Sequence, residues 1–283
     1  MLESCQRRLG VCPTPDGTEA IEEIMADIRP YQTRVANAGT RTDAAIDEGL
    51  RAYMLKVYNL MGLGLVITGL AAFGTIMLAT TGDPASAVAT LPNGKMLTSF
   101  GYAIFGSPLR WLVILAPLAA VFFLSFRVNK LSVSAAQTAF WVYAALVGLS
   151  LSSIFLIYTS ASIVQTFFVT AASFGALSLY GYTTKRDLTA MGSFLIMGVF
   201  GLMIAMVVNI FLGSPALQFA ISGIGVLIFA GLTAYDTQNI KEMYFEGDDV
   251  LVAGRKAVIG ALRLYLDFIN LFTFLLQFLG NRN

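Results

Sequence analysis

Long apolar segments separated by short polar stretches make up the chain beyond residue 50. Several of these segments reach the ~20 residues that a helix needs to cross a bilayer. The pattern therefore predicts an all-α fold class, a polytopic membrane protein with a bundle of seven transmembrane helices. The helices are expected at about Lys56–Ala79, Trp111–Phe126, Ala135–Tyr158, Ser162–Tyr182, Met191–Leu212, from Pro215 to Ile240, and Ala257–Gly280. The second is the shortest, contains Pro117, and leaves open a start among residues 100–110.

Residues 1–50 differ from the rest, because charged side chains recur throughout them. Two stretches, Glu19–Ile28 and Thr42–Tyr53, are candidates for short amphipathic helices. No apolar core followed by a small-residue cleavage site occurs there, so the first spanning helix is expected to act as an uncleaved signal. We predict two domains, a poorly ordered cytoplasmic N-terminal tail at 1–50 and the seven-helix transmembrane domain at 51–283.

Composition narrows the chemistry. The chain is 57% hydrophobic and only 12% charged, whereas soluble domains carry about 25% charged residues. It has no His, which removes the Ser-His-Asp triad and the HExxH zinc site. Cys5 and Cys12 have the spacing of neither a redox pair nor a zinc knuckle. A net charge of +1 without a basic block argues against nucleic acid as a partner. We expect no enzymatic activity and no cofactor.

Loop charges predict the orientation. The positive-inside rule places the N-terminus and the loops after the second, fourth and sixth helices, which carry Lys and Arg, in the cytoplasm. In the loop at 80–110, on the other side, Lys95 and Arg110 are mild exceptions. We expect a bacterial inner (plasma) membrane, with an organelle membrane as the alternative. The basic residues that set this orientation are Arg127 and Lys130 after the second helix, Lys185 and Arg186 after the fourth, and Lys241, Arg255 and Lys256 after the sixth.

Two carboxylates, Asp236 and Asp267, lie inside the sixth and seventh apolar segments. A carboxylate at membrane depth is costly and is rarely kept without a role. From Pro215 to Asp236 is about 32 Å of helix, and from Gly280 back to Asp267 is about 20 Å, so the two depths agree to about 10 Å. Because a short loop joins the two helices, they are expected to be antiparallel neighbours. Spacing alone leaves a direct contact open.

Carboxylates in contact would form a proton sensor. Two like charges in a low dielectric do not both ionise cheaply, so the pair would share a proton at lower pH and separate at higher pH. The pair also offers oxygen ligands to Ca²⁺, which takes six to eight oxygens in typical sites. Thr233, Asn239, Asn270 and water are candidate auxiliary ligands. We therefore expect a weak, transient calcium site on the carboxylate pair.

Charge pairing is the alternative explanation for the two acids. Arg263 lies four residues before Asp267 on the same helix face and is placed to neutralise it. Lys241 and Asn239 are candidates to do the same for Asp236. Arg127 is a third candidate partner, with a role in setting the topology as its alternative.

The flanks of both acids carry a resemblance. AYDTQNIKEMY around Asp236 and YLDFINLFTFLLQFLG around Asp267 resemble the signature of the transmembrane Bax inhibitor motif family, the Bax inhibitor-one-like proteins of bacterial type. AYMLKVYNLMGLGLVITGLAAF, at Ala52–Phe73, is similar to that family's first helix, and the resemblance covers about residues 50–280. It implies a seven-helix membrane fold and a pH-sensitive calcium leak with Asp236 and Asp267 as the sensor.

The resemblance also implies a latch. In relatives an arginine on the second helix latches onto the aspartate of the sixth, and Arg127 is the nearest match here. The family's acidic residue on the second helix has no counterpart within Trp111–Phe126.

We predict a calcium leak channel that is gated by a di-aspartyl proton sensor. Its expected partners are the lipid bilayer, the transported calcium ion and a possible membrane protein. The alternatives are a non-conducting regulator that binds a membrane protease or another membrane partner, and a proton-coupled carrier of a small solute.

Overall fold

The structure is a computed structural model that describes residues 18–91, 93–127 and 131–282. Cys5, Cys12 and Lys130, which entered the predictions above, lie outside the described residues. The chain divides into two compact units, Met1–Gly49 and Leu50–Asn283. A poorly ordered cytoplasmic tail at 1–50 stays a prediction.

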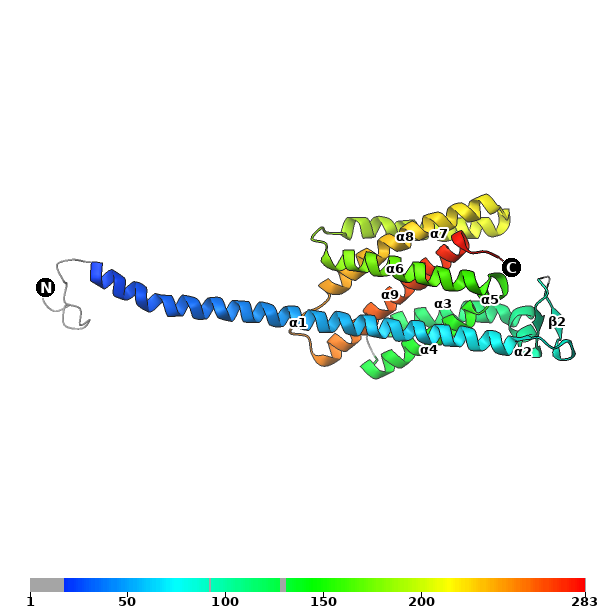
Figure 1. Cartoon of the computed structure of the whole chain (residues 1–283), viewed down its shortest axis with the longest axis horizontal. Helices are drawn as coiled ribbons and strands as arrows, with labels where there is room; N and C mark the ends of the chain where they lie inside the picture. The colour runs from blue at the N-terminus through cyan, green and yellow to red at the C-terminus, as the bar shows by residue number, and fades with distance from the viewer. Residues whose placement is uncertain (1–17, 92, 128–130, 283) are drawn as a thin grey trace. The chain divides into compact units, whose positions relative to one another are not determined.

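The described part of the chain is dominated by long helices, drawn in Figure 1. Six of them are long and apolar enough to cross a membrane, or up to seven if a bent pair counts as one span. The prediction of an all-α polytopic membrane bundle is therefore confirmed. The helix bounds are α1 Thr18–Ala79, α3 Leu109–Arg127, α4 Val133–Leu151, α5 Ile154–Ile157, α6 Ser160–Thr183, α7 Thr189–Leu212, α8 Pro215–Glu242 and α9 Val250–Leu279.

The second predicted span is bent rather than straight. Segments Ser99–Gly106 and Leu109–Leu124 meet at 66°, and the first consists of α2 (Ser99–Gly101) followed by the π-helical turn η2 (Tyr102–Gly106). Ser107 stops the first segment and starts the second, because its hydroxyl accepts a hydrogen bond from the backbone N–H of Leu109 at 3.1 Å. Pro108 follows and offers no N–H to continue the first helix. The expected helix at Trp111–Phe126 is thus the second arm of this bent pair.

The segment between α1 and α2 forms a small antiparallel sheet. It has the strand order β1–β3–β2, with β1 at Thr80–Thr81, β3 at Met96–Leu97 and β2 at Ala89–Thr90. A short 3₁₀ turn, η1 at Pro84–Ser86, precedes β2. Figure 1 shows the sheet at the end of the helices where the C-terminus lies.

Helix α9 forms the centre of the bundle. In its spanning window 67% of the residues are buried, against 11–39% in the other five spans. Contacts are densest between α8 and α9, and α9 also packs on α4 and α6. Small residues permit this packing, since a Cβ built at Gly181 on α6 would lie 2.2 Å from the carbonyl oxygen of Ala234 on α8. The site residues of α8 and α9 are therefore held in the best packed part of the molecule.

Candidate functional site: a buried carboxyl pair

The two acidic residues meet between α8 and α9. Their carboxyl groups lie within hydrogen-bonding reach of each other. Asp267 is 5% exposed, and the Asp236 side chain is 17% exposed. The short connection of residues 243–249 and the tight packing of the two helices produce this contact, although helix lengths alone suggested depths about 10 Å apart.

One oxygen of the pair lacks a partner. Asp267 Oδ2 is buried and has no hydrogen-bond partner among the described residues. The neighbouring carboxyl of Asp236 accepts hydrogen bonds unless it carries a proton. Buried polar atoms are almost always satisfied in proteins, so an exception calls for a physical reason. A proton on one carboxyl, or a cation held by both, supplies the missing interaction.

Arg263 is the cation beside the pair, and it approaches Asp236. Its Nη1 lies 3.9 Å from Asp236 Oδ1 and donates a hydrogen bond to Asn239 Oδ1 at 3.1 Å. Sequence spacing pointed instead to pairing with Asp267. Helical side chains lean toward the N-terminus of their helix, so Arg263 extends away from Asp267, which lies one turn C-terminal, and reaches across to α8. Arg263, with 43% of its side chain exposed, therefore neutralises Asp236 more directly than the more deeply buried Asp267.

The other basic candidates lie elsewhere. The Lys241 ammonium group donates to the backbone carbonyl of Tyr182 at 2.9 Å and lies over the Tyr182 aromatic ring. It therefore helps to hold α8 against α6. Arg127 is exposed at the end of α3, with its guanidinium carbon 6.0 Å from the centre of the Phe123 ring. Among the described residues it makes no ion pair with Asp236. The latch role of Arg127 stays a prediction.

The auxiliary oxygen ligands stay predictions as well. The Thr233 hydroxyl donates to the Phe229 carbonyl at 2.8 Å, and the Asn270 amide donates to Leu266 at 2.9 Å. Asn239 Oδ1 accepts from Arg263. Within the described ranges, no group of three or more His, Cys, Asp or Glu side chains gathers around one point. The carboxyl pair alone therefore offers charged oxygens here, which suits a passing cation better than a stored one.

Sequence reasoning missed a chain of hydroxyl groups next to the pair. Tyr58 on α1 lies 2.6 Å from the Ser178 hydroxyl on α6, and Ser178 lies 3.0 Å from Thr237 on α8, the residue after Asp236. A second buried contact joins Tyr265, two residues before Asp267, to Thr68 on α1 at 2.6 Å. Hydroxyl groups are common in membrane helices, so their presence alone does not indicate such contacts. The one indication in the sequence was that Thr237 and Tyr265 lie within two residues of the acids. These contacts tie both acidic segments to α1.

Fold and site together define a polytopic membrane protein with a carboxyl pair buried between its last two helices. The chain belongs to the family described as inhibitor of apoptosis-promoting Bax1, whose family model matches residues 50–283. The resemblance found in the flanks of the two acids is thus confirmed over the whole membrane domain.

Bacterial relatives match over nearly their full length. A Rickettsia prowazekii protein is 48% identical over 243 residues, which cover 86% of this chain and 95% of the relative. A Caulobacter vibrioides protein is 46% identical over 241 residues, 85% of this chain and 92% of the relative. The Escherichia coli inner membrane protein YbhL is 44% identical over 246 residues, 86% of this chain and 97% of the relative.

Proposed function

We propose that this membrane protein is a pH-sensitive calcium leak in which Asp236 and Asp267 form the proton sensor. The observation that carries the proposal is the contact between these two carboxyl groups in the buried core, with one oxygen left without a partner. The proposal includes no enzymatic step and no cofactor, and calcium is the transported ion. It places the protein in a bacterial inner membrane with the N-terminus in the cytoplasm, in keeping with the similarity to the inner membrane protein YbhL and with the loop charges.

The gating step follows from electrostatics. A single proton between the carboxyl groups makes a hydrogen bond that holds α8 against α9. When both groups are ionised, two like charges face each other where the dielectric is low, and Coulomb repulsion there exceeds that in water several-fold. Arg263 offsets part of the charge on Asp236 but is itself 43% exposed. The contact is therefore stable at acidic pH and weakens as pH rises, so we expect the leak to increase with pH.

Calcium passage uses the same groups in their ionised state. The separated carboxylates supply part of the six to eight oxygens that Ca²⁺ prefers, and water supplies the rest. An incomplete shell of this kind binds weakly and releases its ion readily, as conduction requires.

The test is calcium flux in proteoliposomes across a pH series. We compare the wild-type chain, the double variant Asp236→Asn with Asp267→Asn, and the control Asp187→Asn, which changes an exposed aspartate in the α6–α7 connection. We expect the double variant to lose the pH dependence, because its amides neither ionise nor share a proton, whereas the control keeps it. Unchanged flux and pH response in the double variant would refute the assignment. Silent wild-type liposomes with a stably co-purifying partner would favour a regulator, and saturable uptake of an organic solute would favour a carrier.

A further inference from the structure

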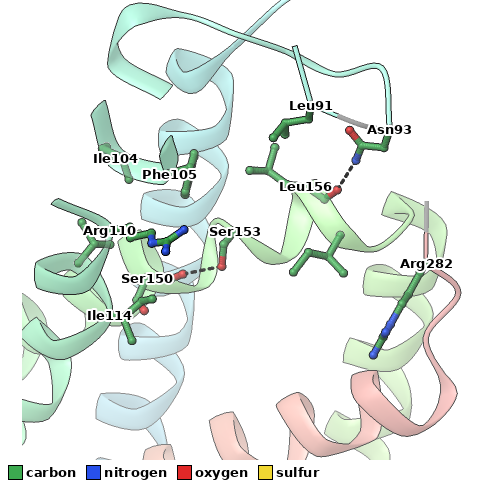
Figure 2. A pocket seen from close by; sticks show the side chains of 12 residues that line it. Leu91, Asn93, Ile104, Phe105, Arg110, Ile114, Ser150, Ser153, Leu156 and Arg282 are labelled. Carbon is green, nitrogen blue, oxygen red and sulfur yellow. Dashed lines mark hydrogen bonds between the residues drawn. The ribbon is translucent and has the colours of Figure 1, made fainter. Parts of the chain in front are cut away.

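A cleft of about 480 Å³ lies at the end of the bundle where the C-terminus is found, opposite the α8–α9 connection. Its walls come from the bent pair η2–α3, from the end of α4 with α5, and from the C-terminal segment after α9. Figure 2 shows its two arginines, with Arg110 beside Ser150 and Ser153 and with Arg282 on the opposite side. Parts of the chain that are distant in sequence thus form one site.

The cleft is positively charged. Arg110 lies in the first turn of α3, and Arg282 is held by an antiparallel bridge to Tyr158. Neither arginine forms an ion pair with a carboxylate among the described residues. The segments at this end, residues 80–110, 152–160 and 280–282, contain three basic residues and one acidic residue, Asp83. Asp83 accepts a hydrogen bond from the backbone N–H of Ala85 instead.

These charges run against the topology rule. Lys95 and Arg110 are the exceptions to the positive-inside pattern, and Arg282 lies at the same end. Lys95 has a local structural use, because its ammonium donates to the carbonyl of Phe155. The two arginines have aromatic neighbours, with guanidinium carbons 5.3 Å from the Trp111 ring and 5.9 Å from the Tyr158 ring. Stacking of this kind orients a guanidinium group and leaves its N–H groups available for an anion.

Two other polar side chains of the cleft are already engaged. The Asn93 amide donates to the Leu156 carbonyl at 2.7 Å, and the Ser153 hydroxyl donates to the Ser150 carbonyl at 3.1 Å. Both bonds are drawn in Figure 2. The guanidinium groups are therefore the charged donors that the cleft offers to a ligand.

The rest of the wall is apolar and continues to the lipid-facing surface. Ile104 and Val113 are buried at 6% and 7% exposure, whereas Ile114 and Ile157 are 53% and 49% exposed. A free inorganic anion gains nothing from such a wall. An anion that is attached to hydrocarbon gains both the arginine contacts and the apolar contacts.

We propose that this cleft binds the headgroup of an anionic phospholipid from the leaflet at this end of the bundle. The phosphate binds the guanidinium group of Arg110 or that of Arg282, which lie on opposite sides of the cleft, and the acyl chains follow Ile114 and Ile157 onto the outer surface of the helices. Guanidinium groups bind phosphate through paired, charge-assisted hydrogen bonds, which makes arginine more selective for this ligand than a point charge. The proposal is independent of the carboxyl pair at Asp236 and Asp267.

The test measures lipid binding to the full-length chain in detergent by native mass spectrometry. Phosphatidylglycerol and phosphatidylcholine with matched acyl chains are titrated against the wild type and against Arg110→Gln combined with Arg282→Gln. The control is Lys185→Gln combined with Arg186→Gln, which removes the same charge from an exposed loop at the other end. We expect the arginine variant to bind phosphatidylglycerol about tenfold more weakly, with phosphatidylcholine binding and the control unchanged.

Three results would overturn the proposal. They are equal binding of the two lipids by the wild type, unchanged phosphatidylglycerol binding by the arginine variant, and displacement of the lipid by equimolar inorganic phosphate, which would identify a free-anion site. If the double variant melts at a lower temperature, the single variants Arg110→Lys and Arg282→Lys carry the test, because they keep the charge and most of the packing. Each is expected to weaken phosphatidylglycerol binding about threefold, and wild-type affinity in both would also reject the guanidinium role.

Discussion

Gly181 sets the distance between α6 and α8 close to the carboxyl pair. A Cβ at this position would lie 2.2 Å from the backbone oxygen of Ala234, two residues before Asp236, whereas ordinary contact begins at 3.4 Å. In the variant Gly181→Ala the two backbones must therefore separate locally by about 1 Å, because neither contacting atom is the end of a flexible side chain. Overpacking of this kind destabilises proteins by about 1–3 kcal/mol.

Gly175 on the same helix provides the matched control. A Cβ at Gly175 would meet no atom within 4 Å. The variant Gly175→Ala therefore adds a methyl group without a clash, and alanine is more favourable than glycine in a helix interior by about 0.5–1 kcal/mol. The two substitutions are chemically identical, yet we expect opposite signs.

The assay is reversible unfolding in detergent micelles, with the free energy of unfolding measured for both variants and the wild type. We expect Gly181→Ala to be less stable than the wild type and Gly175→Ala to be equally or more stable. An unaltered free energy of unfolding in Gly181→Ala, or an equal loss in both variants, would show that the α6–α8 distance is not set by this glycine.

Two further predictions concern a buried hydroxyl group and an exposed loop acid. Tyr265→Phe should reduce the free energy of unfolding in micelles by about 0.5–1.5 kcal/mol, because it removes the 2.6 Å contact between the Tyr265 and Thr68 hydroxyl groups. The loss stays small because the Thr68 hydroxyl still donates to the backbone carbonyls of Gly64 and Ala144. A loss above that range would point to a larger rearrangement. Hydrogen bonds from the side chain and backbone of Thr189 lower the pKa of Asp187. The ionised Asp187 carboxylate therefore stabilises the folded state above the ordinary carboxyl pKa of about 4, and this stabilisation is lost as pH falls through the lowered pKa. Asp187→Ala should accordingly melt below the wild type at neutral pH and approach it in strong acid, and a constant difference in melting temperature across that range would contradict this reasoning.

The helices were predictable because lipid imposes a simple rule on composition and length. Helix α7 is observed at Thr189–Leu212 and was expected at Met191–Leu212, and α8 begins at the expected Pro215. The bend before α3 was not predicted, because it depends on a π-helical turn and on the Ser107 hydroxyl, neither of which changes the apolar pattern. Helix α9 begins at Val250, seven residues before the expected Ala257, because the helix continues through Arg255 and Lys256, which were assigned to the loop.

The candidate site was predictable in its residue types and less so in its contacts. Charge at membrane depth identified Asp236 and Asp267 directly. The partner of Arg263 was not given by spacing, because a difference of four residues fixes a shared helix face but not the direction in which a long side chain extends. The hydroxyl contacts of Thr237 and Tyr265 were missed for a related reason, since their partners come from α6 and α1 and only the packed bundle brings these helices together.

The central claim is that protonation decides whether the two carboxyl groups stay in contact. The most direct test is the distance between the Asp236 and Asp267 carboxyl groups in structures of the lipid-reconstituted protein at one acidic and one alkaline pH. We predict contact between the two groups at acidic pH, and separation with water between them at alkaline pH. An unchanged contact at both pH values, in a protein whose calcium flux does respond to pH over the same range, would contradict the account.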